Sequence, residues 1–296
     1  MGFIDFYVAS LIAGSILGMP RALLLKAGAR IAVPLLGTIA VVFITLGLIG
    51  AALGYGLRES VLFVAAPIMG GGVGAGVVPM SQIYESQMGG EASSYVATLI
   101  PAVIIANVLT IFCAGIFNGI TYKGQQFFVG FNGNGQIVRV AGKAEDFSGK
   151  PKPTGGIFNV LIIGLLPESF EDAVSTWFGF VSGTLTPALL VGISITFFEF
   201  DELGALLSDW RYPVLVLLAV VVAVVVSGAL GWLVKMYYVE TSIAVGMGMT
   251  DMGGTGDVAV VSAANRLELM PFLQVSSRIG GALVLLLVSL LIPVLN

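Results

Sequence analysis

Histidine is absent from this sequence, cysteine occurs once, and charged residues are few. Without histidine, the chain has no histidine-based catalytic triad, proton relay or metal site. The single cysteine, Cys113, lies in an apolar run and rules out both an intrachain disulfide and CxxC chemistry. Asp, Glu, Lys and Arg together make up 10% of the residues, whereas soluble domains carry about 25%. The composition therefore argues against a separate soluble domain.

Apolar residues and glycines dominate instead. Of the 296 residues, 57% are hydrophobic and 40 are glycines, and the mean hydropathy is +1.02. A helix crosses a bilayer with about 20 mostly apolar residues, and glycine is frequent where membrane helices pack closely. The segments that satisfy this length are residues 4–25, 31–53, 94–120, 174–198, 212–238 and 271–295. We therefore predict an all-α polytopic membrane protein.

Two further apolar stretches, residues 61–84 and 241–264, are interrupted by glycine tetrads in "IMGGGVGAG" and "DMGGTGD". Each glycine costs a helix up to about 1 kcal/mol relative to alanine. We therefore predict two broken, re-entrant hairpins, each entering and leaving on one side of the membrane. Irregular backbone persists in a membrane only where protein buries it or water bathes it, so the breaks indicate a site.

The same order of elements occurs twice: span, span, broken hairpin, span. Gly192 follows Gly14 after 178 residues, and the second tetrad, residues 253–256, follows the first, residues 71–74, after 182. Two matched landmarks at similar offsets indicate an internal repeat. The predicted domains are a first repeat at 1–121, a central loop with a short apolar segment at 122–173, and a second repeat at 174–296.

The central loop is polar, with a short β-hairpin expected at "FFVGFNGNGQIVRV". If neither the hairpins nor residues 157–166 cross the membrane, most basic residues fall on one side. These residues are Arg21, Lys26, Arg30, Lys123, Arg139, Lys143, Lys150, Lys152, Lys235 and Arg266. Only Arg58 and Arg211 fall on the other side. The positive-inside rule then predicts inverted repeats in the plasma membrane, a cytoplasmic central loop, and a C-terminus outside.

Inverted repeats with broken helices are the architecture of secondary transporters, because two similar halves can open one central site to each side in turn. Half-helix N-termini suit an anion, and half-helix C-termini suit Na⁺. We therefore expect a transporter in the lipid bilayer. An ion channel or a membrane scaffold without a transport cycle is the alternative, although a channel requires a continuous polar helix face and these spans are uniformly apolar.

Arg278 lies inside the last apolar span, seven residues after Pro271. A charge within a membrane span is costly and normally faces a partner or a ligand. Its planar guanidinium matches a carboxylate in two-point geometry, so we expect it to bind a carboxylate substrate. The alternatives are that Arg278 reaches toward the membrane surface or pairs with Asp257 or Asp251.

Asp257 directly follows the second tetrad. With Thr255 and Ser276 or Ser277, it can form an oxygen cage for Na⁺; alternatively, it caps a helix beginning at Val258. Asp251 is interpreted either as a cap of the hairpin or as a proton-coupling carboxylate.

Ser81 and Gln82 follow the first tetrad and either add polar contacts or mark the end of a loop. The tetrads lack the Gly-Lys-Ser/Thr of a nucleotide-binding loop, and no nucleic acid partner is expected. Because no nucleophile–base set is present, we do not expect an enzyme.

Three segments together resemble the 2-hydroxycarboxylate transporter family of sodium-coupled citrate, malate and lactate carriers: "LIAGSILGMPRALLLKA", "PIMGGGVGAGVVPMSQIYES" and "GGTGDVAVVSAANRLELMPFLQVSSRIGG". The resemblance implies an elevator-like symporter, a homodimer, and coupling to Na⁺ or H⁺. The substrate-binding residues that it implies are Gly72, Val73, Gly74, Gly253, Gly254, Gly256 and Arg278. The resemblance implies Asp257 and Ser277 as Na⁺ ligands, and we add Thr255 as a third ligand because it lies two residues before Asp257.

The sequence also departs from the family pattern. Met252 stands where citrate carriers have an arginine, and Val73 stands where they have an asparagine. Fewer polar groups at these positions predict a smaller acid, such as malate or a monocarboxylate. Family members are also longer than this chain, which leaves a truncated, inactive relative as a further alternative.

Overall fold

The computed structural model describes residues 21–139, 208–266 and 269–295, without the side chains of residues 21–29, Lys123 and Thr255. Most of the predicted span at 4–25, the whole of the span at 174–198 and the segment at 157–166 lie outside the described residues. The described part of the chain is mostly helical and contains no β-strand.

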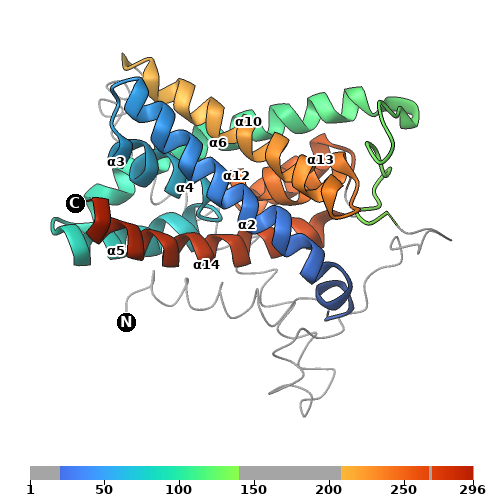
Figure 1. The fold of residues 1–296 in the computed structure, drawn as a ribbon. Coiled ribbons are helices and arrows are strands. Elements are labelled where there is room, and N and C mark those ends of the chain that lie inside the picture. The colour runs from blue at the N-terminus through green and yellow to red at the C-terminus, as the bar shows by residue number, and fades with distance from the viewer. Residues whose placement is uncertain (1–20, 140–207, 267–268, 296) are drawn as a thin grey trace, which may run out of the picture.

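Four long helices form the framework (Figure 1). They are α2 (Arg21–Ala52), α6 (Ala92–Ile120), α10 (Arg211–Leu233) and α14 (Met270–Leu295). Each contains a stretch that is long and apolar enough to cross a membrane. Helices α2 and α10 pack against each other along their length. The prediction of an all-α protein with membrane-length helices in these four regions is therefore confirmed.

The outward faces of these helices are apolar. Ile44 on α2, Phe112 on α6 and Leu290 on α14 are 62%, 67% and 71% exposed. On the inward faces, Leu46 and Val284 are fully buried. Large apolar side chains in rows on the outside of a protein require an apolar surrounding, which a lipid bilayer provides.

The first glycine tetrad interrupts a helical segment. Its elements are α3 (Leu57–Glu59), η1 (Ser60–Ala65), α4 (Ala66–Met69), η2 (Val73–Val77) and α5 (Val78–Met88). The break lies at Gly71 and Gly72, whose φ angles are +81° and +98°. Only glycine adopts such angles without strain, so the tetrad determines where the helix ends.

The second tetrad interrupts a similar segment. Its elements are α11 (Tyr238–Thr241), η6 (Ser242–Met247), α12 (Gly248–Thr250) and α13 (Thr255–Ala263). The chain breaks between Asp251 and Gly254, where Gly253 and Gly254 have φ angles of +69° and +55°.

The two segments share a further local feature. Each passes through one π-helical stretch before its break, and η6 begins at Ser242, 182 residues after η1 begins at Ser60. The tetrads have the same offset. π-Helical turns are rare, so this match extends the correspondence from sequence to helix geometry. Both serines also lie directly against a glycine of the preceding long helix, Gly50 and Gly228 respectively.

Three local predictions were wrong. Helix α2 begins at Arg21 rather than near residue 31, so it includes the last residues of the predicted span at 4–25; no proline follows Pro20 there, and alanine, leucine, lysine and arginine favour helix. No β-hairpin forms over the described residues 127–139, which instead make an isolated bridge between Val138 and Met236, after α10. Helix α10 ends at Leu233 rather than near residue 238. Two residues after this end, Lys235 adopts a left-handed conformation with φ of +64°.

Candidate functional site

The two glycine turns contact each other through their backbones. Gly72 lies against the carbonyl group of Met252, and a Cβ added to Gly253 would lie 3.0 Å from the carbonyl oxygen of Gly71. A side chain at Gly72 would overlap the opposite turn, and one at Gly253 would crowd it. The glycines therefore permit the close approach of two segments that lie far apart in the sequence.

Helix α14 supports the first turn. Gly71 lies against the carbonyl oxygen of Ser277, and a Cβ added to Gly281 would lie 3.1 Å from the Cα of Gly71. Arg278 therefore occupies the stretch of α14 that faces the first turn, and its side chain is half-buried. Val73 and Gly74, which follow the first turn in η2, are buried.

Helix α6 supports the second turn. The Asn107 Oδ1 accepts a hydrogen bond of 3.2 Å from the backbone N–H of Met252, and a Cβ on Gly256 would lie 2.8 Å from the same oxygen. One helical turn further along α6, the hydroxyl groups of Thr110 and Thr250 are 2.9 Å apart. The sequence analysis missed Asn107 and Thr110, although two polar residues three apart in an apolar span were a usable signal.

Two buried carboxyl groups occupy the second turn. Asp251 and Asp257 are both fully buried, and their side chains interact with each other. The Asp251 Oδ1 accepts a hydrogen bond of 2.8 Å from the N–H of Gly253, two residues further on, within the turn itself. Its Oδ2 and both oxygens of Asp257 have no donor in hydrogen-bond geometry among the described residues. The positive charge of Arg278 acts on Asp257.

This arrangement fits a cation. Burying a carboxylate is costly unless it is paired or coordinates a metal, and here the charge of Arg278 acts on Asp257 of the two buried acids. The carboxylate oxygens of this pair are hard ligands of the kind that Na⁺ prefers. Ser277 is nearly buried, and its Oγ lies 3.5 Å from the carbonyl oxygen of Gln274; the Oγ of Ser276 is buried without a hydrogen-bond partner in the described chain. The side chain of Thr255 lies outside the described residues.

Other predictions about these residues need correction. Helix α13 begins at Thr255 with Gly254 as its N-cap, so Asp257 lies inside the first helical turn and does not cap a helix that begins at Val258. Ser81 and Gln82 lie within α5 rather than at a loop end. The Ser81 hydroxyl donates to the carbonyl oxygen of Val78, 2.7 Å away.

Comparison with known proteins now places the chain. The model of the 2-hydroxycarboxylate transporter family matches residues 1–159 and 156–290. The chain belongs to this family. It is therefore an integral membrane protein of a transporter family rather than an enzyme.

Several characterised proteins are similar over most of their length. The citrate transporter CitP of Leuconostoc mesenteroides is 35% identical, over 99% of this chain and 73% of its own. The Na⁺–malate symporter of Bacillus subtilis is 35% identical, over 95% of this chain and 69% of its own. The citrate/malate–proton symporter of the same organism is 33% identical, over 98% of this chain and 72% of the symporter's own length.

Proposed function

We propose that the chain is a secondary active symporter that moves a small 2-hydroxycarboxylate together with Na⁺ or H⁺. The observation that carries this proposal is the contact between the two glycine turns, beside Arg278 and the buried acid pair. Relatives named as citrate and malate transporters, coupled to Na⁺ in one case and to H⁺ in another, support the same substrate and ion classes.

Arg278 and the backbone of the turns bind the substrate. The Arg278 guanidinium pairs with one carboxylate in two-point geometry. The first N–H groups of a helix lack partners inside that helix and favour an anion, and both breaks are followed by such a helix start, at Val73 and at Thr255. Gly254 has open space where a Cβ would stand, so a substrate can approach its backbone. Gly72, Gly74, Gly253 and Gly256 are proposed to contribute as parts of the two turns that meet beside the substrate.

Asp257 holds the coupling cation, with Thr255 and Ser277 as the other proposed ligands. Asp251, Asp257 and Arg278 together carry one net negative charge when all three are ionised. A bound cation neutralises this charge, which removes the repulsion that an incoming carboxylate would meet at Arg278. Cation and substrate then strengthen each other's binding, and such reciprocal coupling is what symport requires.

The segments around the tetrads are proposed to be re-entrant hairpins of two inverted repeats. Only residues 53–56 separate α2 from α3, and only 89–91 separate α5 from α6. Both arms of the first segment therefore open at the end of the bundle where α6 begins (Figure 1). Residues 234–237 join α10 to α11, so the second segment opens at the opposite end. We further propose that the protein is a homodimer in the plasma membrane and works by an elevator-like movement. Its central loop is then cytoplasmic, and its C-terminus lies outside the cell.

Met252 and Val73 favour a smaller acid than citrate. Met252 lies in the second turn, against Gly72, and Val73 follows the first turn. Neither side chain can hydrogen-bond a third carboxylate. We therefore propose malate or a monocarboxylate such as lactate as the preferred substrate.

Uptake into proteoliposomes tests this proposal. Purified protein is reconstituted, and entry of labelled malate, citrate and lactate is measured with a Na⁺ gradient, a pH gradient or neither. Gradient-driven uptake of one acid, lost in Arg278→Ala, is the expected result. An ion conductance without gradient-driven uptake would favour the channel, and a folded protein inactive in every condition would favour a non-transporting scaffold or an inactive relative.

A further inference from the structure

The chain directly after α6 is held in place by hydrogen bonds to another part of the protein. Residues 125–139, here called the 125–139 loop, run alongside the residues that join α10 to α11 (Figure 1). The N–H groups of Tyr238 and Val239 donate to the carbonyl oxygens of Gly130 and Phe131, at 3.0 and 2.9 Å. The Tyr237 N–H and the Arg139 N–H make further backbone hydrogen bonds of 2.9 Å in the same region. The loop is therefore fixed to the start of the second glycine-containing segment.

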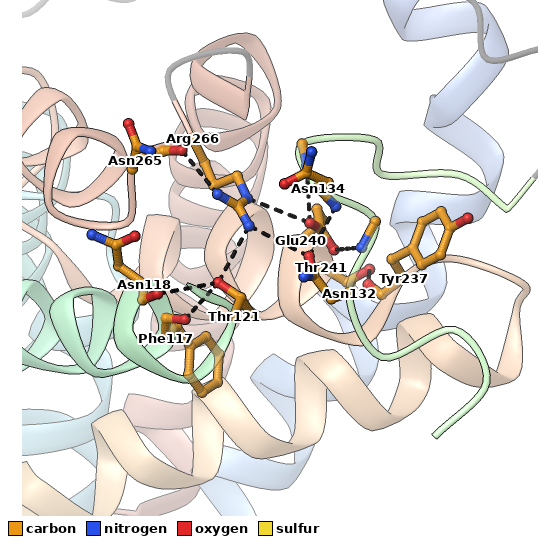
Figure 2. Close-up of polar contacts among 12 residues, drawn as sticks. Phe117, Asn118, Thr121, Asn132, Asn134, Tyr237, Glu240, Thr241, Asn265 and Arg266 are labelled. Atoms are coloured by element: carbon orange, nitrogen blue, oxygen red, sulfur yellow. Dashed lines mark hydrogen bonds and ion pairs between the residues drawn. The ribbon is translucent and has the colours of Figure 1, made fainter. Parts of the chain in front are cut away.

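A buried ion pair adds to this attachment (Figure 2). Glu240 is fully buried and accepts hydrogen bonds from the N–H groups of Gly133 and Gly135, at 2.8 and 3.0 Å. The Arg266 Nε lies 3.6 Å from the Glu240 Oε1, and its Nη2 donates to the Thr121 Oγ1 at 3.2 Å. Burial raises the pKa of Glu240, and the loop N–H groups and Arg266 act against that shift. The hydrogen bonds from the loop therefore favour the charged form of the Glu240 carboxylate.

Glu240 and Arg266 lie at the two ends of the second glycine-containing segment. Glu240 belongs to α11, where the segment begins, and Arg266 follows α13, where it ends. Thr121 follows the last residue of α6. The ion pair consequently joins the base of this segment, the end of α6 and the 125–139 loop into one unit.

Aromatic contacts fix the direction in which the tip of the loop points. The ring of Phe128 makes edge contacts with Phe131 and Trp232, with centroids 5.1 and 6.1 Å apart. The Trp232 Nε1 donates to the carbonyl oxygen of Val129 at 2.8 Å. The Arg139 guanidinium lies over the Trp232 ring, 5.4 Å from its centroid.

This well-held tip exposes large apolar side chains. Phe127 is 67% exposed and Val129 is 85% exposed, and Leu233 at the end of α10 is 68% exposed. Phe128 and Trp232 are partly exposed between them. A rigid structure that presents apolar groups outward has a partner for them.

The level of the tip along the bundle identifies that partner. Two membrane-length helices, α6 and α10, end at Ile120 and Leu233, directly beside the loop. The exposed apolar faces of these helices therefore continue into the tip. Aromatic residues are enriched at the boundary between the hydrocarbon core and the headgroups, and the exposed Lys235 nearby suits anionic headgroups.

We propose that Phe127, Phe128, Val129, Trp232 and Leu233 form a lipid anchor that sits in the headgroup region of the bilayer. Through Glu240 and Arg266, this anchor fixes the base of the second glycine-containing segment at the membrane surface. The anchor does not depend on which substrate is carried.

Depth measurement tests the anchor in the reconstituted full chain. Val129→Cys is made in a Cys113→Ser background, spin-labelled, and exposed to oxygen, which partitions into lipid, and to a water-soluble nickel chelate. Val221→Cys on the exposed face of α10 is the control within the hydrocarbon, and Glu91→Cys in the turn before α6 is the control in water.

The expected depth of the label at Val129 lies between the two controls, with at least a twofold higher ratio of oxygen to nickel accessibility than at Glu91. A ratio equal to that at Glu91 would overturn the proposal, because the tip would face water. Protection from both reagents would also overturn it, because protein, such as a second copy of the chain, would then cover the tip.

The link to Glu240 has its own test. Glu240→Gln, or the milder Asn132→Ala at the Arg266 contact, is combined with the label at Val129. The label should become more mobile in these variants while the label at Val221 is unchanged. Unchanged mobility at Val129 in both folded variants would show that Glu240 and Arg266 do not hold the anchor.

Discussion

Asp251 and Asp257 interact with each other across the second glycine turn, fully buried, while the positive charge of Arg278 acts on Asp257. When both acids and Arg278 are ionised, one negative charge is left to be neutralised. The same turn lies against the first glycine turn, so charge and backbone converge at one place between the two halves of the chain.

Arg278→Ala is expected to reduce substrate affinity or uptake by roughly 30-fold to 5,000-fold, because removing one partner of a buried charge pair costs about 2–5 kcal/mol. Arg278→Lys should retain part of the activity, since the charge remains without the planar fork. Arg211→Ala is the control: its ion pair with Asp209 lies at the surface, at 2.8 Å, and should matter little. Equal uptake by Arg278→Ala and the parent protein would contradict the assignment.

Asp257→Asn should remove stabilisation of the protein by Na⁺. The thermal unfolding midpoint of the detergent-purified protein is compared in NaCl and in KCl at equal ionic strength. We expect the parent protein to unfold at a higher temperature in NaCl and the variant to show no difference, because the amide removes the negative charge that attracts the cation. A variant with the same response to Na⁺ as the parent would exclude Asp257 as a ligand.

Gly72→Ala should disrupt the contact between the turns, and Gly89→Ala provides a closely matched control. Both glycines have similar backbone angles, with φ and ψ of 98° and −175° at Gly72 and 78° and −169° at Gly89. The backbone strain of an alanine, about 1–3 kcal/mol, is therefore shared. A Cβ at Gly72 meets the Met252 carbonyl group, whereas one at Gly89 has no neighbour within 4 Å.

Uptake measurements and unfolding curves distinguish these two glycine variants. Gly72→Ala should lose transport and more stability than Gly89→Ala, which should retain transport. Equal losses in both variants would show that the close approach of the turns does not matter.

Met252→Arg should shift substrate preference toward citrate, because it adds a positive charge beside the first turn. Met252→Gln has a similar length and no charge, and serves as the control. Unlabelled citrate and unlabelled malate are each titrated against uptake of labelled malate. The measurement is the concentration of citrate that halves uptake, divided by the concentration of malate that does so. The ratio should fall in the arginine variant alone; the same ratio in both variants would argue against a role for charge at this position.

The sequence predicted those parts of the fold that depend on local composition. Apolar runs indicated the helices at 31–53, 94–120 and 271–295, because a membrane-length helix needs only a continuous apolar stretch. The start of α2 at Arg21 was missed, because residues 21–25 were assigned to the preceding apolar span and the charged residues up to Arg30 interrupt the apolar run, although they also favour helix.

Contacts between distant segments could not be read from the sequence. Asn107 gains its partner in the second turn only because α6 packs against that segment. Glu240 and Arg266 lie 26 residues apart in the sequence and gave no periodic signal, yet they meet at the base of one segment. The positions of the acids and of Arg278 were visible as charges in apolar surroundings, whereas the partners that the charges share required the folded chain.

Accumulation of labelled malate against its own concentration gradient tests the central claim most directly. Proteoliposomes with equal malate on both sides receive an inward Na⁺ gradient, or in parallel an inward proton gradient. A coupled symporter should raise the internal malate concentration above the external one, and an ionophore that collapses the gradient should abolish the rise. Malate that never exceeds its external concentration under either gradient, in a protein shown to be folded and to bind malate, would contradict symport.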